Sequence, residues 1–102
     1  MNNQKAMNHS IEIKYCTQCR WMLRATWMAQ ELLSTFDGDI KHLTLTPGTG
    51  GIFEVSANGN LVWSRKEKGR FPEITELKQA VRDEIVPDKH LGHSDKNKSG
   101  NS

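Results

Sequence analysis

The hydrophobic period of the chain changes from two to about 3.6 between residues 11 and 36, and this change constrains the fold most. In "IEIKY" every second residue is apolar, which predicts a strand that ends at Cys16. From Thr17 to about Phe36, apolar residues recur every three or four positions, which predicts a helix. A strand followed by a helix predicts a right-handed crossover to a second, parallel strand.

The expected helix has one apolar face and one solvated face. Arg20, Arg24 and Glu31 mark the solvated side, and Gly38 follows the helix at the usual left-handed cap position. The residues expected to face the core are Met22, Ala25, Ala29, Leu32, Leu33 and Phe36.

Three more strands are expected in the middle of the chain. The segment "IKHLTLT" predicts a strand over residues 40–46, and "PGTGG" at residues 47–51 predicts the loop that ends it. The segments "IFEVSA" and "LVWSR" flank Asn58 and Gly59, which is the strongest short hairpin signal.

The turn also predicts which hairpin residues share a face. Pairing Ala57 with Asn60 puts Val55 and Val62 on one face and Trp63 on the other, so both faces are expected to be partly covered.

A second helix is expected after the basic turn "KEKGR". Pro72 opens it and Pro87 ends it, while Glu73 and Glu76 place negative charge in its first turn. Its apolar stripe consists of Ile74, Leu77, Val81 and Ile85.

The order strand–helix–strand–strand–strand–helix predicts an α/β fold, with a four-stranded mixed sheet and two helices in a thioredoxin-like arrangement. At 102 residues the chain is expected to form one domain, at residues 9–91. The polar segments at residues 1–8 and 92–102 are expected to be disordered.

Cys16 and Cys19 are the only cysteines, and this fold places them where the first strand meets the first helix. A helix N-terminus stabilises a thiolate and lowers the pKa of a cysteine. We therefore expect Cys16 to attack a disulfide and Cys19 to resolve the mixed disulfide. The lesser alternatives are half of a zinc site, an inert pair, and a structural disulfide, which would constrain the chain little.

Three segments of the chain resemble the selenoprotein W-like family (SelT/SelW/SelH, or Rdx) in its bacterial, cysteine-containing form. They are "YCTQCRWMLRATWMAQELLSTF", "GGIFEVSANGNLVW" and "FPEITELKQAVRDEI", and the resemblance runs from about Ile11 to Leu91. It implies a thioredoxin-like fold and a thiol-based, glutathione-linked oxidoreductase or antioxidant role. Members with selenocysteine carry it at the position of Cys19, so the resemblance points to Cys19 as the reactive atom.

Two further groups of residues are candidates for substrate or partner contact. In a thioredoxin-like sheet the loop before the third strand faces the cysteines, and its glycines would let a substrate approach them. Here that loop consists of Pro47, Gly48, Thr49, Gly50 and Gly51. The alternative is that the loop is only a mobile connector.

Trp21 and Trp27, on the first helix, are candidates for partner contact, although core packing is the more common role. The basic run at residues 65–68 is expected to be a solvated turn, with attraction of glutathione or an acidic partner as the lesser alternative.

Composition limits the remaining function classes. With 14 basic and 12 acidic residues the net charge is only +2, without a basic cluster, so we expect no nucleic-acid partner. No apolar run reaches the ~20 residues of a membrane span, and the N-terminus has no signal-like apolar region, so we expect a cytoplasmic protein. His90 and His93, with Asp88 and Asp95, have unspecific spacing, and we expect no metal.

The expected function is therefore thiol–disulfide exchange with a protein disulfide or glutathione, by a monomer or weak homodimer without a bound cofactor. The alternative is a non-catalytic binding module whose partner affinity changes when the same cysteines are oxidised. Whether the protein is an enzyme is left open by the sequence.

Overall fold

The computed structural model describes residues 8–92, which form four strands and three helices. The strands are β1 (His9–Cys16), β2 (Ile40–Gly48), β3 (Phe53–Ala57) and β4 (Asn60–Ser64), and the helices are α2 (Met22–Thr35), α3 (Arg65–Lys68) and α4 (Ile74–Ile85). Of the two segments expected to be disordered, residues 1–8 and 92–102, all but Asn8 and Gly92 lie outside the described residues. None of the helices in residues 8–92 is long and apolar enough to cross a membrane.

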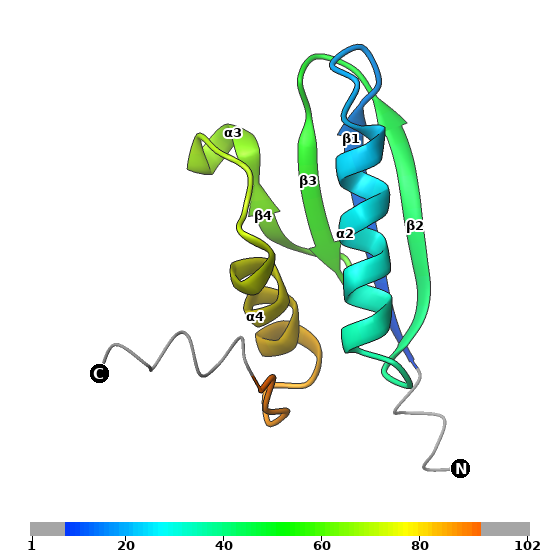
Figure 1. The fold of residues 1–102 in the computed structure, drawn as a ribbon, viewed down its shortest axis with the longest axis vertical. Coiled ribbons are helices and arrows are strands. Elements are labelled where there is room, and N and C mark those ends of the chain that lie inside the picture. The colour runs from blue at the N-terminus through cyan, green and yellow to red at the C-terminus, as the bar shows by residue number, and fades with distance from the viewer. Residues whose placement is uncertain (1–7, 93–102) are drawn as a thin grey trace.

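The strands form one mixed sheet in the order β2-β1-β3-β4. β1 pairs in parallel with β2 and antiparallel with β3, and β3 pairs antiparallel with β4. The helix α2 makes the crossover between the two parallel strands (Figure 1). The expected α/β, thioredoxin-like arrangement is confirmed, with α3 as an additional short helix.

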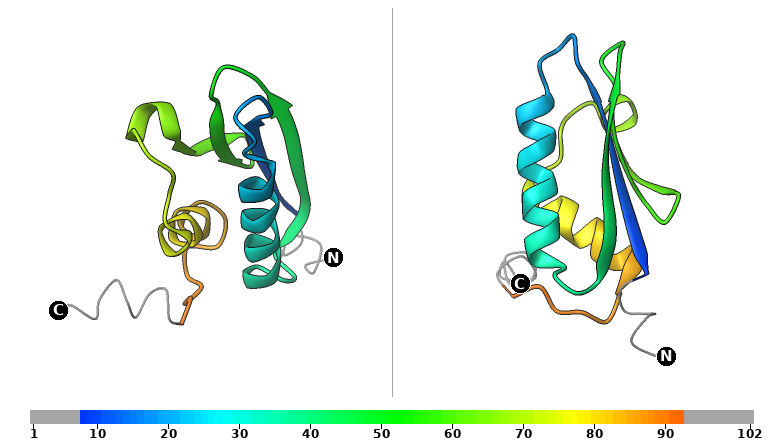
Figure 2. Two further views of the ribbon diagram at one scale, coloured as in Figure 1. Left: turned by 45° about the horizontal axis from the view of Figure 1, so that its top comes forward. Right: turned by 90° about the vertical axis from the view of Figure 1, so that its right-hand side faces the viewer.

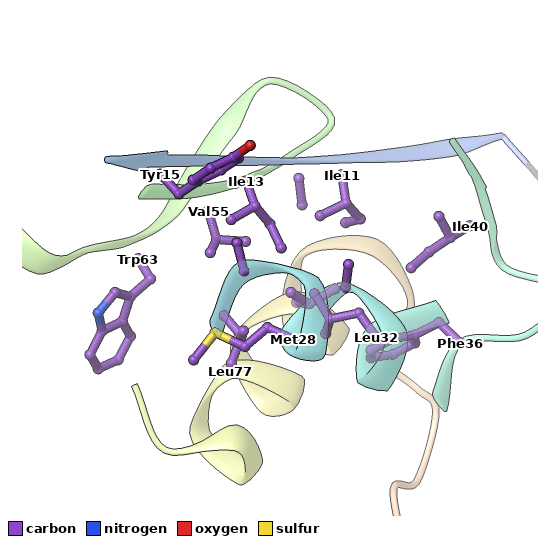
Figure 3. Close-up of a cluster of buried hydrophobic side chains, with 14 of the residues drawn as sticks. Ile11, Ile13, Tyr15, Met28, Leu32, Phe36, Ile40, Val55, Trp63 and Leu77 are labelled. Atoms are coloured by element: carbon purple, nitrogen blue, oxygen red, sulfur yellow. The ribbon is translucent and has the colours of Figure 1, made fainter. Parts of the chain in front are cut away.

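The core lies between the sheet and the two longer helices, where α2 packs on β1 and β2 and α4 on β3 and β4 (Figure 2). Apolar side chains from both layers meet there (Figure 3). The largest fully buried ones are Phe36, Phe53, Ile11, Ile13, Met28, Leu32, Leu77, Val55 and Val81. The alternation in β1 places residues 11, 13 and 15 on this face, as the sequence predicts.

The helix α2 begins later than the sequence predicts. Residues 17–20 form a turn, Trp21 is the N-cap, and the first helical residue is Met22. Met22 and Leu33 are exposed, not buried as expected, because both lie at the edge of the helical stripe that meets the sheet. Met28, absent from the expected core face, is buried in their place.

The strand β2 is longer than expected, because it includes Pro47 and Gly48, which we had assigned to the loop. These two residues pair with Tyr15 and Cys16 at the end of β1. A proline fits there because β2 is an edge strand, where one missing N–H is tolerated. No described peptide bond is cis, so Pro47 is trans.

The hairpin turn is confirmed, with φ of 52° at Asn58 and 84° at Gly59, as a type I′ turn requires. The expected faces are wrong for β4, because the register shifts between Val55 and Ser56. This bulge pairs Val55 with Trp63 and turns the indole into the core. Bulges of this kind re-aim the side chains that follow them.

The expected solvated turn at residues 65–68 is instead the helix α3. The Ser64 hydroxyl accepts a hydrogen bond from the Glu67 N–H at 3.3 Å, and Gly69 ends the helix with φ of 79°. The helix α4 starts with a capping box, in which the Glu73 and Glu76 side chains each accept from the other's backbone N–H.

Candidate functional site

The two cysteines lie at the end of β1 and in the turn that follows it. Cys16 is the last residue of β1 and is fully buried, whereas Cys19 is half-buried. The Cys19 thiol donates a hydrogen bond to the Cys16 sulfur, with the sulfur atoms 2.8 Å apart. A disulfide bond needs about 2.05 Å, so a small movement of the turn would be enough to close one.

Two backbone hydrogen bonds shape this turn. The Arg20 N–H donates to the Thr17 carbonyl at 3.1 Å, and the Trp21 N–H donates to the Cys16 carbonyl at 3.4 Å. Arg20 has a φ of 59°, in the left-handed region that few residues other than glycine adopt. The turn therefore brings both sulfurs together before α2 begins.

The pKa of Cys16 is lowered, but the helix end is not the reason. We expected Cys16 at the helix N-terminus, yet α2 starts at Met22. The main cause of the lowered pKa is the hydrogen bond from Cys19, which stabilises the Cys16 thiolate. Burial opposes this effect, and backbone N–H groups of Gly51, Cys19 and Gln18 support it.

The pKa of Cys19 is raised, mainly because its proton is shared with Cys16. Burial and the charge on Cys16 act in the same direction, while the positive charge of Arg65 and the Gly51 N–H act against it. When the pair is singly ionised, the remaining proton therefore stays preferentially on Cys19 and the negative charge on Cys16.

The loop between β2 and β3 is held against the cysteine turn. The Thr17 N–H and hydroxyl both donate to the Gly48 carbonyl, at 3.0 and 3.3 Å. Gly50 and Gly51 have φ of 74° and 76°, which directs the Gly51 N–H towards the sulfurs. Thr49 is exposed.

The predicted loop residues therefore lie beside the cysteines, with Pro47 and Gly48 inside β2. Whether this loop faces a substrate stays a prediction.

An aromatic and cationic cluster lies next to the site. The Trp21 and Phe71 rings meet edge to face with centroids 4.8 Å apart. The Arg65 guanidinium lies 5.0 Å from the centroid of each ring, and that of Arg24 lies 4.0 Å from Phe71. Trp27 is outside this cluster and is 47% exposed on α2.

The sequence missed three residues that shape the site: Thr17, Arg65 and Phe71. Arg65 belongs to the basic run that the sequence marked, but only the path of β4 brings it near Cys19. A cavity of about 510 Å³ lies beside Gly51 and Arg65.

Within residues 8–92, no group of three or more His, Cys, Asp or Glu side chains is arranged to hold a metal ion. His90 accepts a hydrogen bond from the Gly92 N–H at 3.0 Å. Asp88 of the same histidine and aspartate group is also described, whereas His93 and Asp95 lie outside the described residues.

The parallel β1–α2–β2 unit, with a C-x-x-C pair at its turn, defines a thioredoxin-like α/β protein with a cysteine pair. The Rdx family model matches residues 10–83, and the chain belongs to the Rdx family.

Two solved structures and two curated proteins are similar to the chain. A selenoprotein W-related protein from Vibrio cholerae is 55% identical, with a TM-score of 0.74 over 76% of this chain and 96% of that one. A protein of Bordetella parapertussis is 56% identical, with a TM-score of 0.74 over 76% and 98%. Migration and invasion enhancer 1 of Mus musculus and that of Bos taurus are each 33% identical over 72 residues, which is 71% of this chain. The match spans 61% of the length of these two relatives.

Proposed function

We propose that the protein carries out thiol–disulfide exchange, with Cys16 and Cys19 as its dithiol–disulfide centre. The observation that carries this proposal is the hydrogen bond from the Cys19 thiol to the Cys16 sulfur, 2.8 Å away, which changes the pKa values of the two thiols in opposite directions. The reactive form is the singly ionised pair, in which Cys16 carries the charge and takes the proton of Cys19, so that the Cys19 thiolate attacks a disulfide. The family membership and the resemblance to a selenoprotein W-related protein support the same chemistry.

The first step forms a mixed disulfide. The Cys19 proton passes to Cys16, and the Cys19 thiolate attacks one sulfur of the substrate disulfide. A new bond forms between Cys19 and that sulfur, the substrate S–S bond breaks, and its second sulfur leaves as a thiolate. The positive charge of Arg65 favours the Cys19 thiolate at this stage.

The second step releases the product. Cys16 gives its proton to the departing thiolate and attacks the Cys19 sulfur. The Cys16–Cys19 disulfide forms, and the remaining substrate sulfur leaves as a second thiolate that takes a proton from water. The substrate disulfide gains two electrons, and the protein dithiol is oxidised by two electrons.

Burial reverses our expectation of which cysteine attacks first. The sequence favoured Cys16, whose lowered pKa suits a nucleophile, but its side chain has no exposed surface. An external disulfide must reach the attacking sulfur, and Cys19 is the half-exposed one. We therefore assign the attack to Cys19 and the resolving step to Cys16, in agreement with the selenocysteine position that the resemblance implies.

The proposed partners are protein disulfides or glutathione, and the proposed compartment is the cytoplasm. Glutathione keeps cytosolic dithiols reduced, so it is a suitable electron donor for the oxidised pair.

The test is a redox titration in glutathione buffers, in which free thiols are alkylated and the intact protein is weighed. We expect a reversible two-electron transition between about −320 and −220 mV. Cys19→Ser should abolish reaction with a substrate disulfide, whereas Cys16→Ser should stop at the mixed disulfide. If both thiols stay reduced and neither forms a mixed disulfide, the proposal is wrong.

A second candidate function rests on the exposed face of α2. Its apolar residues Met22, Leu23, Trp27 and Leu33 are between 45% and 83% exposed. Exposed apolar residues of this kind suit contact with a protein partner. In this second function the cysteines would not turn over a substrate, and their oxidation would change the affinity for that partner. A binding module would show no turnover of small disulfides, but its affinity for a partner would differ between the oxidised and reduced forms.

A further inference from the structure

A cavity adjoins the sulfur pair on the side of β3 and α3. It holds about 510 Å³ and is lined in part by Gly50, Gly51, Ser64, Arg65 and Lys66. Gly51 borders both places, because its N–H also supports the Cys16 thiolate. A group in this cavity would therefore lie next to a disulfide that meets Cys19.

The cavity has an arginine whose charge is not neutralised within the described residues. Arg65 forms no ion pair with any carboxylate of residues 8–92, and its buried Nε atom has no hydrogen-bond partner there. Its guanidinium is instead held at 5.0 Å from the centroids of Trp21 and Phe71. Stacking on aromatic rings fixes the plane of an arginine without using its charge for an ion pair.

The charges around the cavity are positive on balance. Arg65 and Lys66 face one acidic lining residue, Glu54. Glu54 is paired across the sheet with Lys14, and opposite charges at such positions attract each other. An anionic ligand would thus meet two cations and a single lining carboxylate, which has a lysine opposite it in the neighbouring strand.

We infer that this cavity binds a carboxylate of the disulfide substrate, and that Arg65 is the main residue that binds it. The protein would then prefer disulfides that carry an acidic group beside the reacting cysteine. A planar guanidinium matches the two oxygens of a carboxylate, and arginine is the residue best suited to that recognition. The inference rests on the proposed thiol–disulfide exchange and adds the substrate class to it.

The test compares three symmetric disulfides of blocked dipeptides, N-acetyl-Cys-X-amide with X as Glu, Gln or Lys. The reduced full-length protein is mixed with each, and the rate of dithiol oxidation is measured by acid quench and intact mass. Each rate is divided by the rate of the same disulfide with dithiothreitol, which removes intrinsic differences. We expect the Glu disulfide to react about fivefold faster than the Gln disulfide, and the Lys disulfide to react most slowly.

Protein variants locate the preference. Arg65→Gln should bring the three rates together, whereas Arg65→Lys should retain part of the preference. Lys41→Gln is the matched control, because it removes the same charge from an exposed residue at the other end of β2. Urea unfolding of each variant reports whether the fold is retained, and the comparison of the three disulfides on the unaltered protein needs no variant.

The outcomes separate the two proposals. If none of the disulfides oxidises the dithiol, the proposed function fails. If all three react at equal relative rates, exchange stands and the inference is overturned. The inference is also overturned if the preference survives Arg65→Gln, or if Lys41→Gln removes it equally, since net charge alone would then explain it.

Discussion

The pairing of Glu76 with Arg70 at the start of α4 gives a prediction with a defined size and pH window. The Glu76 carboxylate accepts two hydrogen bonds from the Arg70 guanidinium, each 2.8 Å, and one from the Glu73 N–H at 2.9 Å. These contacts lower the pKa of Glu76 to about 2, from an ordinary value of 4.5, with the Arg70 hydrogen bonds as the main cause. Glu76→Gln removes the charge but keeps an acceptor for the capping box.

The magnitude follows from the pKa and the exposure. The difference from 4.5 to about 2 would be worth about 3.4 kcal/mol at about 1.4 kcal/mol per pKa unit. The Arg70 and Glu76 side chains are 52% and 37% exposed, so solvent screens the pair strongly. We therefore expect Glu76→Gln to lower the free energy of unfolding by only about 1 kcal/mol at pH 7.

The pH dependence has a definite sign. The folded-state pKa is lower than the unfolded one, so the unfolded chain binds more protons between pH 4.5 and about 2. The stabilisation is complete above this window and is lost as the pH falls through it. Urea unfolding of both proteins at pH 7, 4 and 2.5, followed by tryptophan fluorescence, should show their difference shrinking towards zero. A difference that stays constant from pH 7 to 2.5 would refute the assignment to this carboxylate.

Three further predictions concern the thiol site and the core. In Cys19→Ala the pKa of Cys16, measured by thiolate absorbance at about 240 nm, should rise because the S–H donor is lost. In Cys19→Ser a hydroxyl donor remains, so the pKa of Cys16 should rise less. Equal pKa values in the two variants would contradict the role of the hydrogen bond. Gly51→Ala forces a side chain into the left-handed region, so it should cost about 1 kcal/mol of stability and raise the same pKa; an unchanged pKa would exclude the Gly51 N–H as a contributor. Leu32→Ala, at a fully buried position, should destabilise by about 2–5 kcal/mol in urea unfolding, and a loss below about 1 kcal/mol would show that the site is not packed as described.

The sequence predicts the arrangement of strands and helices because the evidence for each is local. The change of period at Cys16 and the Asn58–Gly59 turn depend on neighbouring residues, and both predictions are confirmed. Element ends were predicted less well. The helix was expected from Thr17, but its start is delayed by a turn with a left-handed Arg20, which no periodicity signals.

The predictions for the hairpin faces and for the Cys16 pKa failed because a pattern of neighbouring residues reports neither strand bulges nor contacts between distant segments. Trp63 was placed on the wrong face because one bulged residue inverts the alternation, and a bulge leaves no mark in a pattern of period two. The source of the lowered Cys16 pKa was also misassigned. It depends on Cys19 and, from a distant segment, on the Gly51 N–H, whose direction follows from tertiary packing.

The contact between the cysteine turn and the β2–β3 loop has a consequence for the newly made chain. Cys16 and Cys19 leave the ribosome well before Gly51 and Arg65, and Thr17 meets Gly48 only when β2 has paired with β1. Until that long-range closure occurs, the two thiols lack the loop amide and the guanidinium and resemble those of a free peptide. The nascent chain is thus expected to react with disulfides as an ordinary peptide with two equivalent thiols, and the division of roles between Cys16 and Cys19 arises only in the completed fold.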